Sequence, residues 1–176
     1  METFRDTIGR RIHACDIRRL SRACDGDVDD KKKAALLTLA HDSDPRTAYN
    51  ALWVLSQMRR TNRKWLQIHR DELIDLLLAT NHVGKQRLLL TVLEFIPITE
   101  SDLRTDYLDF CLSRINSLDP CAIRALSLKQ AYAQCRFFPE LMNELLLCID
   151  MMTSAELPQG LKSTLRIIRR RMARVK

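Results

Sequence analysis

The stretch DPRTAYNALWVL, at positions 44–55, decides the fold because similar stretches recur along the chain. The later copies are HVGKQRLLLTVL at 82–93, DPCAIRALSLKQ at 119–130 and LPQGLKSTLRII at 157–168. Successive copies begin 38, 37 and 38 residues apart. A fixed period of this length is typical of stacked helix pairs, since one pair cannot bury its own apolar face and needs a neighbour.

Each repeat is predicted to hold two helices, and the quoted stretch begins the second of them. The first helices are expected roughly over residues 29–42, 64–80, 101–117 and 139–152. Apolar residues recur there at spacings of three and four, which places them on one helical stripe. The predicted core positions are Leu36, Leu37, Leu39, Leu73, Ile74, Leu77, Leu108, Cys111, Ile115, Leu145, Cys148 and Ile149.

Prolines and aspartates mark the starts of the second helices. Pro45, Pro120 and Pro158 fall at the same place in three of the four repeats. The first turn of a helix tolerates proline because the missing N–H would have no partner there. Asp44 and Asp119 are expected to be N-caps. Glycine is scarce and no alternating Val, Ile and Thr run ends in a hairpin turn, so the sequence predicts an all-α fold.

These features resemble the HEAT-like (armadillo-type) helical repeats of small, bacterial-type proteins, over residues 29–176. The resemblance is carried by Asp44, Pro45 and Arg46, then Ala48, Ala51, Leu52 and Leu55, with a weaker copy at Asp119 and Pro120. The second repeat departs from the pattern at His82 and Gly84, and the fourth at Leu157. The resemblance implies an α-α superhelix, a solenoid of about four helix pairs whose second helices line the concave side. It implies no particular function.

The N-terminal region, residues 1–25, predicts one or two further helices. Phe4, Ile8, Ile12 and Cys15 fall on one face, and these helices are expected to cap the N-terminal end of the stack. The stretch DGDVDD, at 25–30, lacks the glycine and glutamate of a calcium loop and is expected to be a solvated linker. Residues 1–176 are therefore predicted to form a single domain, with a cap at 1–25 and four helix-pair repeats over 29–176.

The composition excludes several classes of protein. Of 176 residues, 46% are apolar and 29% are charged, which is typical of a folded domain rather than a disordered or membrane-embedded chain. The apolar runs fall far short of the roughly 20 residues needed to cross a bilayer, and the charged N-terminus lacks a signal-peptide core, so we expect a cytoplasmic protein. The six cysteines are expected to be reduced thiols. Histidines and cysteines show no zinc spacing, so no metal or other cofactor is expected.

The net charge of +7 arises in the last helix. Residues 157–176 carry seven basic side chains and no acid, whereas the remaining 156 residues carry 22 of each sign. The basic patch comprises Arg169, Arg170, Arg171 and Arg174, together with Lys162, Arg166 and Lys176. One interpretation is a solvated outer face of the last helix. The other is an anion-binding end for nucleic acid or an acidic protein; a membrane surface is disfavoured because interfacial aromatics are missing.

Equivalent positions of the second helices form two rows along the predicted concave side. The first row is Tyr49, Arg87, Arg124 and Lys162, and the second is Trp53, Thr91, Leu128 and Arg166. Both rows fall outside the apolar stripe of the first repeat and are expected to face solvent or a partner. Tyr49 and Trp53 could stack on a base, a peptide aromatic or an arginine. Packing of Trp53 against a neighbouring helix is an equal alternative.

Three functions are compatible with this sequence. The leading hypothesis is a non-catalytic interaction module that binds a protein or peptide partner through the concave face. The second is nucleic-acid binding through the basic row and the basic last helix. The third is a DNA-alkylation glycosylase, an activity that HEAT-like folds can host, but the rows contain no Asp and their nearest acid is Glu94. No activated nucleophile, carboxylate pair or phosphate loop is evident, so no catalytic residue is assigned.

Overall fold

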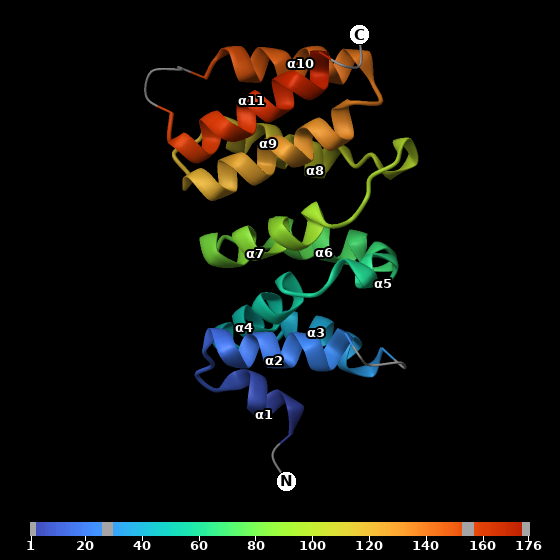
Figure 1. The fold of residues 1–176 in the computed structure, drawn as a ribbon, viewed down its shortest axis with the longest axis vertical. Helices are drawn as coiled ribbons and strands as arrows, with labels where there is room; N and C mark the ends of the chain where they lie inside the picture. Colours follow the sequence, from blue (N-terminus) through green and yellow to red (C-terminus); the bar gives the residue numbers. More distant parts are fainter. Residues whose placement is uncertain (1–2, 26–29, 153–156, 174–176) are drawn as a thin grey trace. The chain divides into compact units, whose positions relative to one another are not determined.

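The computed structural model describes residues 3–25, 30–152 and 157–173, and helices are the only regular elements in these ranges (Figure 1). The all-α prediction is therefore confirmed. The chain divides into two compact units, Met1–Ile96 (unit 1) and Pro97–Lys176 (unit 2). The single domain expected over residues 1–176 stays a prediction. Most of the expected linker, residues 26–29, lies outside the described residues, as does Arg174 of the basic patch.

Unit 1 holds the predicted cap and two helix pairs. Its elements are α1 (Phe4–Gly9), α2 (Ala14–Asp25), α3 (Lys31–Ala40), α4 (Pro45–Ser56), the short 3-10 helix η1 (Arg60–Asn62), α5 (Arg63–Ile68), α6 (Arg70–Ala79) and α7 (Val83–Glu94). Helix α3 pairs with α4, α6 pairs with α7, and α4 packs beside α7. Helices α1 and α2 pack on the first helix pair through contacts with α4, and their role as a cap stays a prediction.

The second helices of unit 1 begin at residues that cap them. The Asp44 carboxylate accepts hydrogen bonds from the backbone N–H of Thr47 at 2.8 Å and from its hydroxyl at 2.5 Å. Pro45 occupies the first turn of α4, as predicted. In the second repeat the imidazole Nδ1 of His82 accepts from the Lys85 N–H at 3.2 Å. Histidine thus supplies the acceptor that aspartate supplies in the first repeat.

Unit 2 holds the other two helix pairs. Its elements are the 3-10 helix η2 (Glu100–Asp102), α8 (Thr105–Ile115), α9 (Cys121–Cys135), α10 (Pro139–Asp150) and α11 (Gln159–Ala173). Helices α8, α10 and α11 all pack against α9 (Figure 1). Helix α9 is therefore the centre of this unit, and it presents buried side chains such as Leu128, Ala131 and Cys135.

Two of the predicted first helices have other boundaries. The helix expected over 64–80 is split into α5 and α6 at His69, where the backbone turns and the imidazole packs on the Trp65 ring at 4.5 Å between centroids. The helix expected over 101–117 begins later, at Thr105. Thr99 and Asp102 form a capping box around the separate 3-10 helix η2, which contains Glu100–Asp102 ahead of this helix.

The expected cap at Asp119 is wrong. Helix α9 begins one residue later than the alignment with α4 implies, so Pro120 rather than Asp119 is its N-cap residue. The proline side chain offers no hydrogen-bond acceptor for the first turn. The Asp119 carboxylate instead accepts hydrogen bonds from Arg114 at 3.0 Å and from the Ser117 hydroxyl at 2.8 Å. Pro158 likewise precedes α11, which begins at Gln159.

The predicted core is buried with three exceptions. Cys148 is half-buried, and of the residues expected on the apolar face of the cap, Phe4 is half-buried and Cys15 is exposed. All six cysteines are free thiols. Burial raises the pKa of the Cys135 thiol to about 12 and raises that of Cys111 further, so both stay protonated at neutral pH.

Candidate functional site

The two aromatic residues of the predicted rows pack against each other in unit 1. The Tyr49 and Trp53 rings meet edge to face with centroids 6.3 Å apart, and Tyr49 also meets the His82 ring at 6.0 Å. Gly84 lies under the same ring, since a Cβ there would approach Tyr49 to 2.9 Å. Both aromatics are half-buried. Part of the Tyr49 ring therefore packs in the contact between α4 and α7. Trp53 lies between the core and the exposed surface.

The basic residues of the first row differ in their surroundings. Arg87 is exposed on α7. Arg124 is half-buried, and its Nε donates a hydrogen bond to the backbone carbonyl of Ile115 at 2.9 Å. This bond ties α9 to the last turn of α8, so Arg124 has a structural role. Lys162 is exposed on α11.

In the second row, Leu128 was predicted to face solvent or a partner, and this prediction is wrong. Leu128 is 0% exposed, on α9, which packs against α8, α10 and α11. Thr91 is half-buried, and its hydroxyl donates to the Arg87 carbonyl of its own helix at 2.8 Å. Arg166 is exposed, as expected. The row residues before Pro97 belong to unit 1 and the later ones to unit 2, and the continuous binding row stays a prediction.

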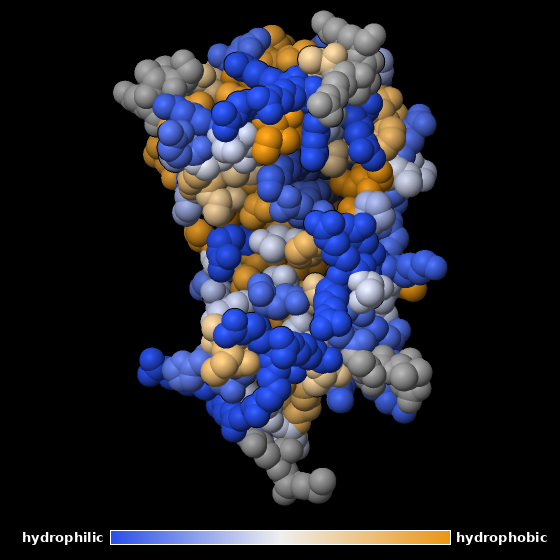
Figure 2. Space-filling view, in the orientation of Figure 1, coloured by the Kyte–Doolittle hydropathy of each residue, from blue (hydrophilic) through white to orange (hydrophobic). Residues whose placement is uncertain are grey.

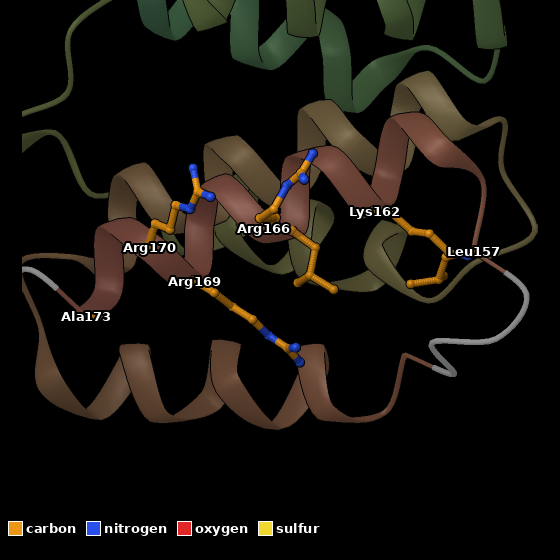
Figure 3. Close-up of a pocket in the computed structure, with 7 residues that line it drawn as sticks. Leu157, Lys162, Arg166, Arg169, Arg170 and Ala173 are labelled. Carbon is orange, nitrogen blue, oxygen red and sulfur yellow. The ribbon is translucent and has the colours of Figure 1, made fainter.

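The strongest site is an open groove along α11, which we call the α11 groove (Figure 3). Its volume is about 490 Å³. Its lining residues are Leu157, Lys162, Leu165, Arg166, Arg169, Arg170 and Ala173. Four of them are basic residues and three are apolar. Figure 2 shows the corresponding mixture of hydrophilic and hydrophobic surface where α11 lies in that view.

The helical period explains why these side chains share one groove. Lys162, Arg166 and Arg170 follow one another at spacings of four, as do Leu165 and Arg169, so each set forms a line along α11. Leu161, Thr164 and Ile168 are buried within unit 2, and Leu165, one turn after Leu161, lies at the edge of this buried stripe. The apolar stripe of α11 is therefore used for packing, while the lines of basic residues are left outside.

The charge of the α11 groove is largely uncompensated. Arg169 reaches toward α10, where one of its guanidinium nitrogens lies 4.0 Å from a carboxylate oxygen of Asp150 (Figure 3). Both side chains are mostly exposed, so this ion pair is weak. Arg166 and Arg170 extend on the side of α11 away from α10 (Figure 3). Lys162, Arg166 and Arg170 form no ion pair with any described residue.

Comparison with known proteins agrees with this architecture. A family model described as a HEAT repeat domain matches residues 4–172. The chain belongs to this HEAT repeat family. Neither a curated protein nor a solved structure matches it. The HEAT repeat match covers both units and includes α1 and α2.

The sequence predicted the basic residues of this HEAT repeat protein's groove but not its apolar ones. Leu157 lies before α11 and Ala173 at its end, and neither follows the periodic pattern that identified the core. Arg171, predicted as part of the same patch, is exposed but does not line the groove. Leu165 is four residues after the buried Leu161, so its spacing on α11 indicates packing rather than a groove.

Two further observations concern other kinds of site. Within residues 3–25, 30–152 and 157–173, no cluster of three or more His, Cys, Asp and Glu side chains could hold a metal ion. In the same ranges, no helix combines the length and the apolar character needed to cross a membrane.

Proposed function

We propose that this HEAT repeat protein is a non-catalytic interaction module that binds an acidic, partly apolar segment of a protein partner in the α11 groove. One observation carries the proposal. A helix with five basic residues and no acid borders an open groove whose floor is apolar. Opposite charge would orient such a partner and speed its encounter, while apolar side chains would fill the floor.

The apolar floor favours a polypeptide over a nucleic acid. Leu157, Leu165 and Ala173 offer nothing that a phosphate backbone can use. Helix α11 contains no aromatic residue on which a base could stack. An amphipathic helix with carboxylates beside leucines would satisfy both parts of the groove at once. Helix α11 has 15 residues, so by the helical rise it offers about 22 Å of length, or roughly four turns of a partner helix.

A surface in unit 1 is proposed as a second, separate contact surface for a protein or peptide partner. Tyr49, Trp53 and Arg87 lie on α4 and α7, and Arg87 is exposed. Half-buried aromatic rings beside an exposed arginine are common anchors at protein interfaces. We propose a peptide-binding role here in preference to glycosylase chemistry, because the Tyr49 ring packs against His82 and Trp53 rather than standing free to stack on a base.

The proposal is tested by the binding of the wild-type chain to three labelled probes. The first is a synthetic helical peptide of about 15 residues, matching the length of α11, with glutamates on one face and leucines beside them. The second is the same peptide with serines in place of the leucines. The third is single-stranded RNA of similar charge. We expect the first peptide to bind at least about tenfold more tightly than the serine peptide.

Nucleic acid is the rival ligand, because the unpaired line of Lys162, Arg166 and Arg170 could also contact phosphates. Binding of RNA alone would replace the proposed function by nucleic-acid binding. For three phosphate contacts on a single strand, the slope of log affinity against log salt concentration should then be about −2. Equal binding of the leucine and serine peptides would show that the apolar floor is not used.

A further inference from the structure

A second, more enclosed pocket lies in unit 2, and it shares no lining residue with the α11 groove. It has a volume of about 350 Å³, within the range of small-molecule sites. It is formed where α9 ends, the chain turns, and α10 begins, and the C-terminal part of α11 closes it. Its apolar walls are Tyr132, Phe137, Phe138, Met142, Leu146 and Met172. We call it the Phe138 pocket.

The turn that builds the Phe138 pocket is held by backbone hydrogen bonds. The N–H of Arg136 donates to the Tyr132 carbonyl at 3.1 Å, and the N–H of Phe138 donates to the Cys135 carbonyl at 3.0 Å. Tyr132 is 6% exposed and lies deepest in these walls. The backbone of the turn is therefore held in place without a ligand, which lowers the ordering cost of binding.

Arg136 adds a fixed positive charge to this apolar pocket. One guanidinium nitrogen donates to the Ile98 carbonyl at 2.8 Å, and the guanidinium plane lies over the Phe137 ring, 4.5 Å from its centroid. These two contacts fix the side chain. A guanidinium has five N–H donors, so most of them stay available. No described carboxylate lies within ion-pair distance of Arg136, so its charge is not neutralised within unit 2.

We propose that the Phe138 pocket binds a small organic carboxylate with an aromatic or branched aliphatic body. The apolar body would enter between the aromatic and methionine side chains, and the carboxylate would accept hydrogen bonds from the free donors of Arg136. An aromatic or aliphatic ligand without the acid would leave the remaining N–H donors of Arg136 without an acceptor from the ligand. An inorganic anion would leave the walls unfilled. This site goes beyond the proposed partner binding and does not depend on it.

The test uses full-length protein labelled with ¹³C at its methionine methyl groups. Met142 and Met172 line the pocket, whereas Met58 is buried in unit 1 and Met151 is exposed just after the end of α10. The probe is 3-phenylpropanoate, and 3-phenylpropanamide is its uncharged match. We expect the carboxylate to shift the Met142 and Met172 signals with a Kd of about 1 mM or tighter, and to leave Met58 and Met151 unchanged. The amide should bind at least about tenfold more weakly.

Variants separate recognition by Arg136 from simple apolar binding. R136Q should weaken the carboxylate to the level of the amide and leave amide binding unchanged, whereas R171Q, which removes an exposed charge from the same unit, should change neither. Equal affinity of the wild type for acid and amide would overturn the proposal, as would unchanged Met142 and Met172 signals at saturating probe. Since the acid and amide are compared on the wild type, the proposal stays testable even if R136Q does not fold.

Discussion

Leu52 shows at the scale of one residue how the repeat pattern becomes stability. It is 0% exposed in α4, at a position that the periodicity assigns to the core. We expect L52A to lower the free energy of unfolding by about 2–5 kcal/mol, because the surrounding helices cannot collapse fully into the space. Chemical denaturation measures the loss. I68A, which truncates a side chain 78% exposed in the same unit, should change it by less than about 0.5 kcal/mol. Equal effects at both positions would contradict the assigned core.

Asp44 makes the stability of unit 1 depend on pH. Hydrogen bonds from the Thr47 hydroxyl and then from its backbone N–H lower the pKa of Asp44 below its ordinary value of 3.8. Because the pKa is lowered in the folded state, the ionised cap stabilises the fold fully at pH values above the ordinary pKa. This stabilisation is lost as the pH falls through the lowered pKa of the folded state. D44A should therefore have a lower melting temperature than the wild type at pH 7, and this difference should shrink in acid.

Asparagine supplies the matched control at the same position. D44N keeps an acceptor oxygen for the Thr47 N–H but cannot titrate, so it should cap α4 without adding this pH dependence. A melting-temperature difference between D44A and the wild type that stays constant through the acid range would show that the charge of Asp44 is not what stabilises the helix start.

At the scale of helices, Arg124 and Arg87 have unequal roles although the repeat makes them equivalent. Arg124 bonds the Ile115 carbonyl and joins α9 to α8, whereas Arg87 is exposed on α7. We expect R124M to cost about 1–3 kcal/mol, because the carbonyl at the end of α8 loses its donor while the apolar stem is kept. R87M should cost less than about 0.5 kcal/mol. Thermal unfolding compares the two, and a reversed order would contradict the contact between α8 and α9.

Element boundaries show what sequence patterns can predict and what they cannot. The starts of α4 and α10 were predictable because proline and its neighbours act locally. The break at His69 was not, because no proline or glycine marks it in the sequence. The later start of α9 depends on Asp119 being held by Arg114 and Ser117.

At the scale of the whole molecule, the period of 37 or 38 residues was enough to predict a HEAT repeat fold. Burial of apolar surface drives the helix pairs to stack, because an isolated pair exposes its apolar face. The basic part of the α11 groove was also predictable, since charge along a helix can be counted directly. The groove floor and the Phe138 pocket were not, because Leu157 and Met172 reach those sites only through tertiary packing.

The most direct test of partner binding in the α11 groove compares two matched charge reversals. R166E/R170E changes two exposed arginines four residues apart on α11, and R18E/R22E makes the same change on α2, also at exposed positions. Both variants alter the net charge equally, so any general attraction of a basic protein for acids falls by the same amount. Fluorescence anisotropy with the acidic, leucine-bearing peptide measures the affinity. We predict that R166E/R170E weakens binding at least about tenfold while R18E/R22E stays near the wild type; equal losses in the two variants would contradict a binding site on α11.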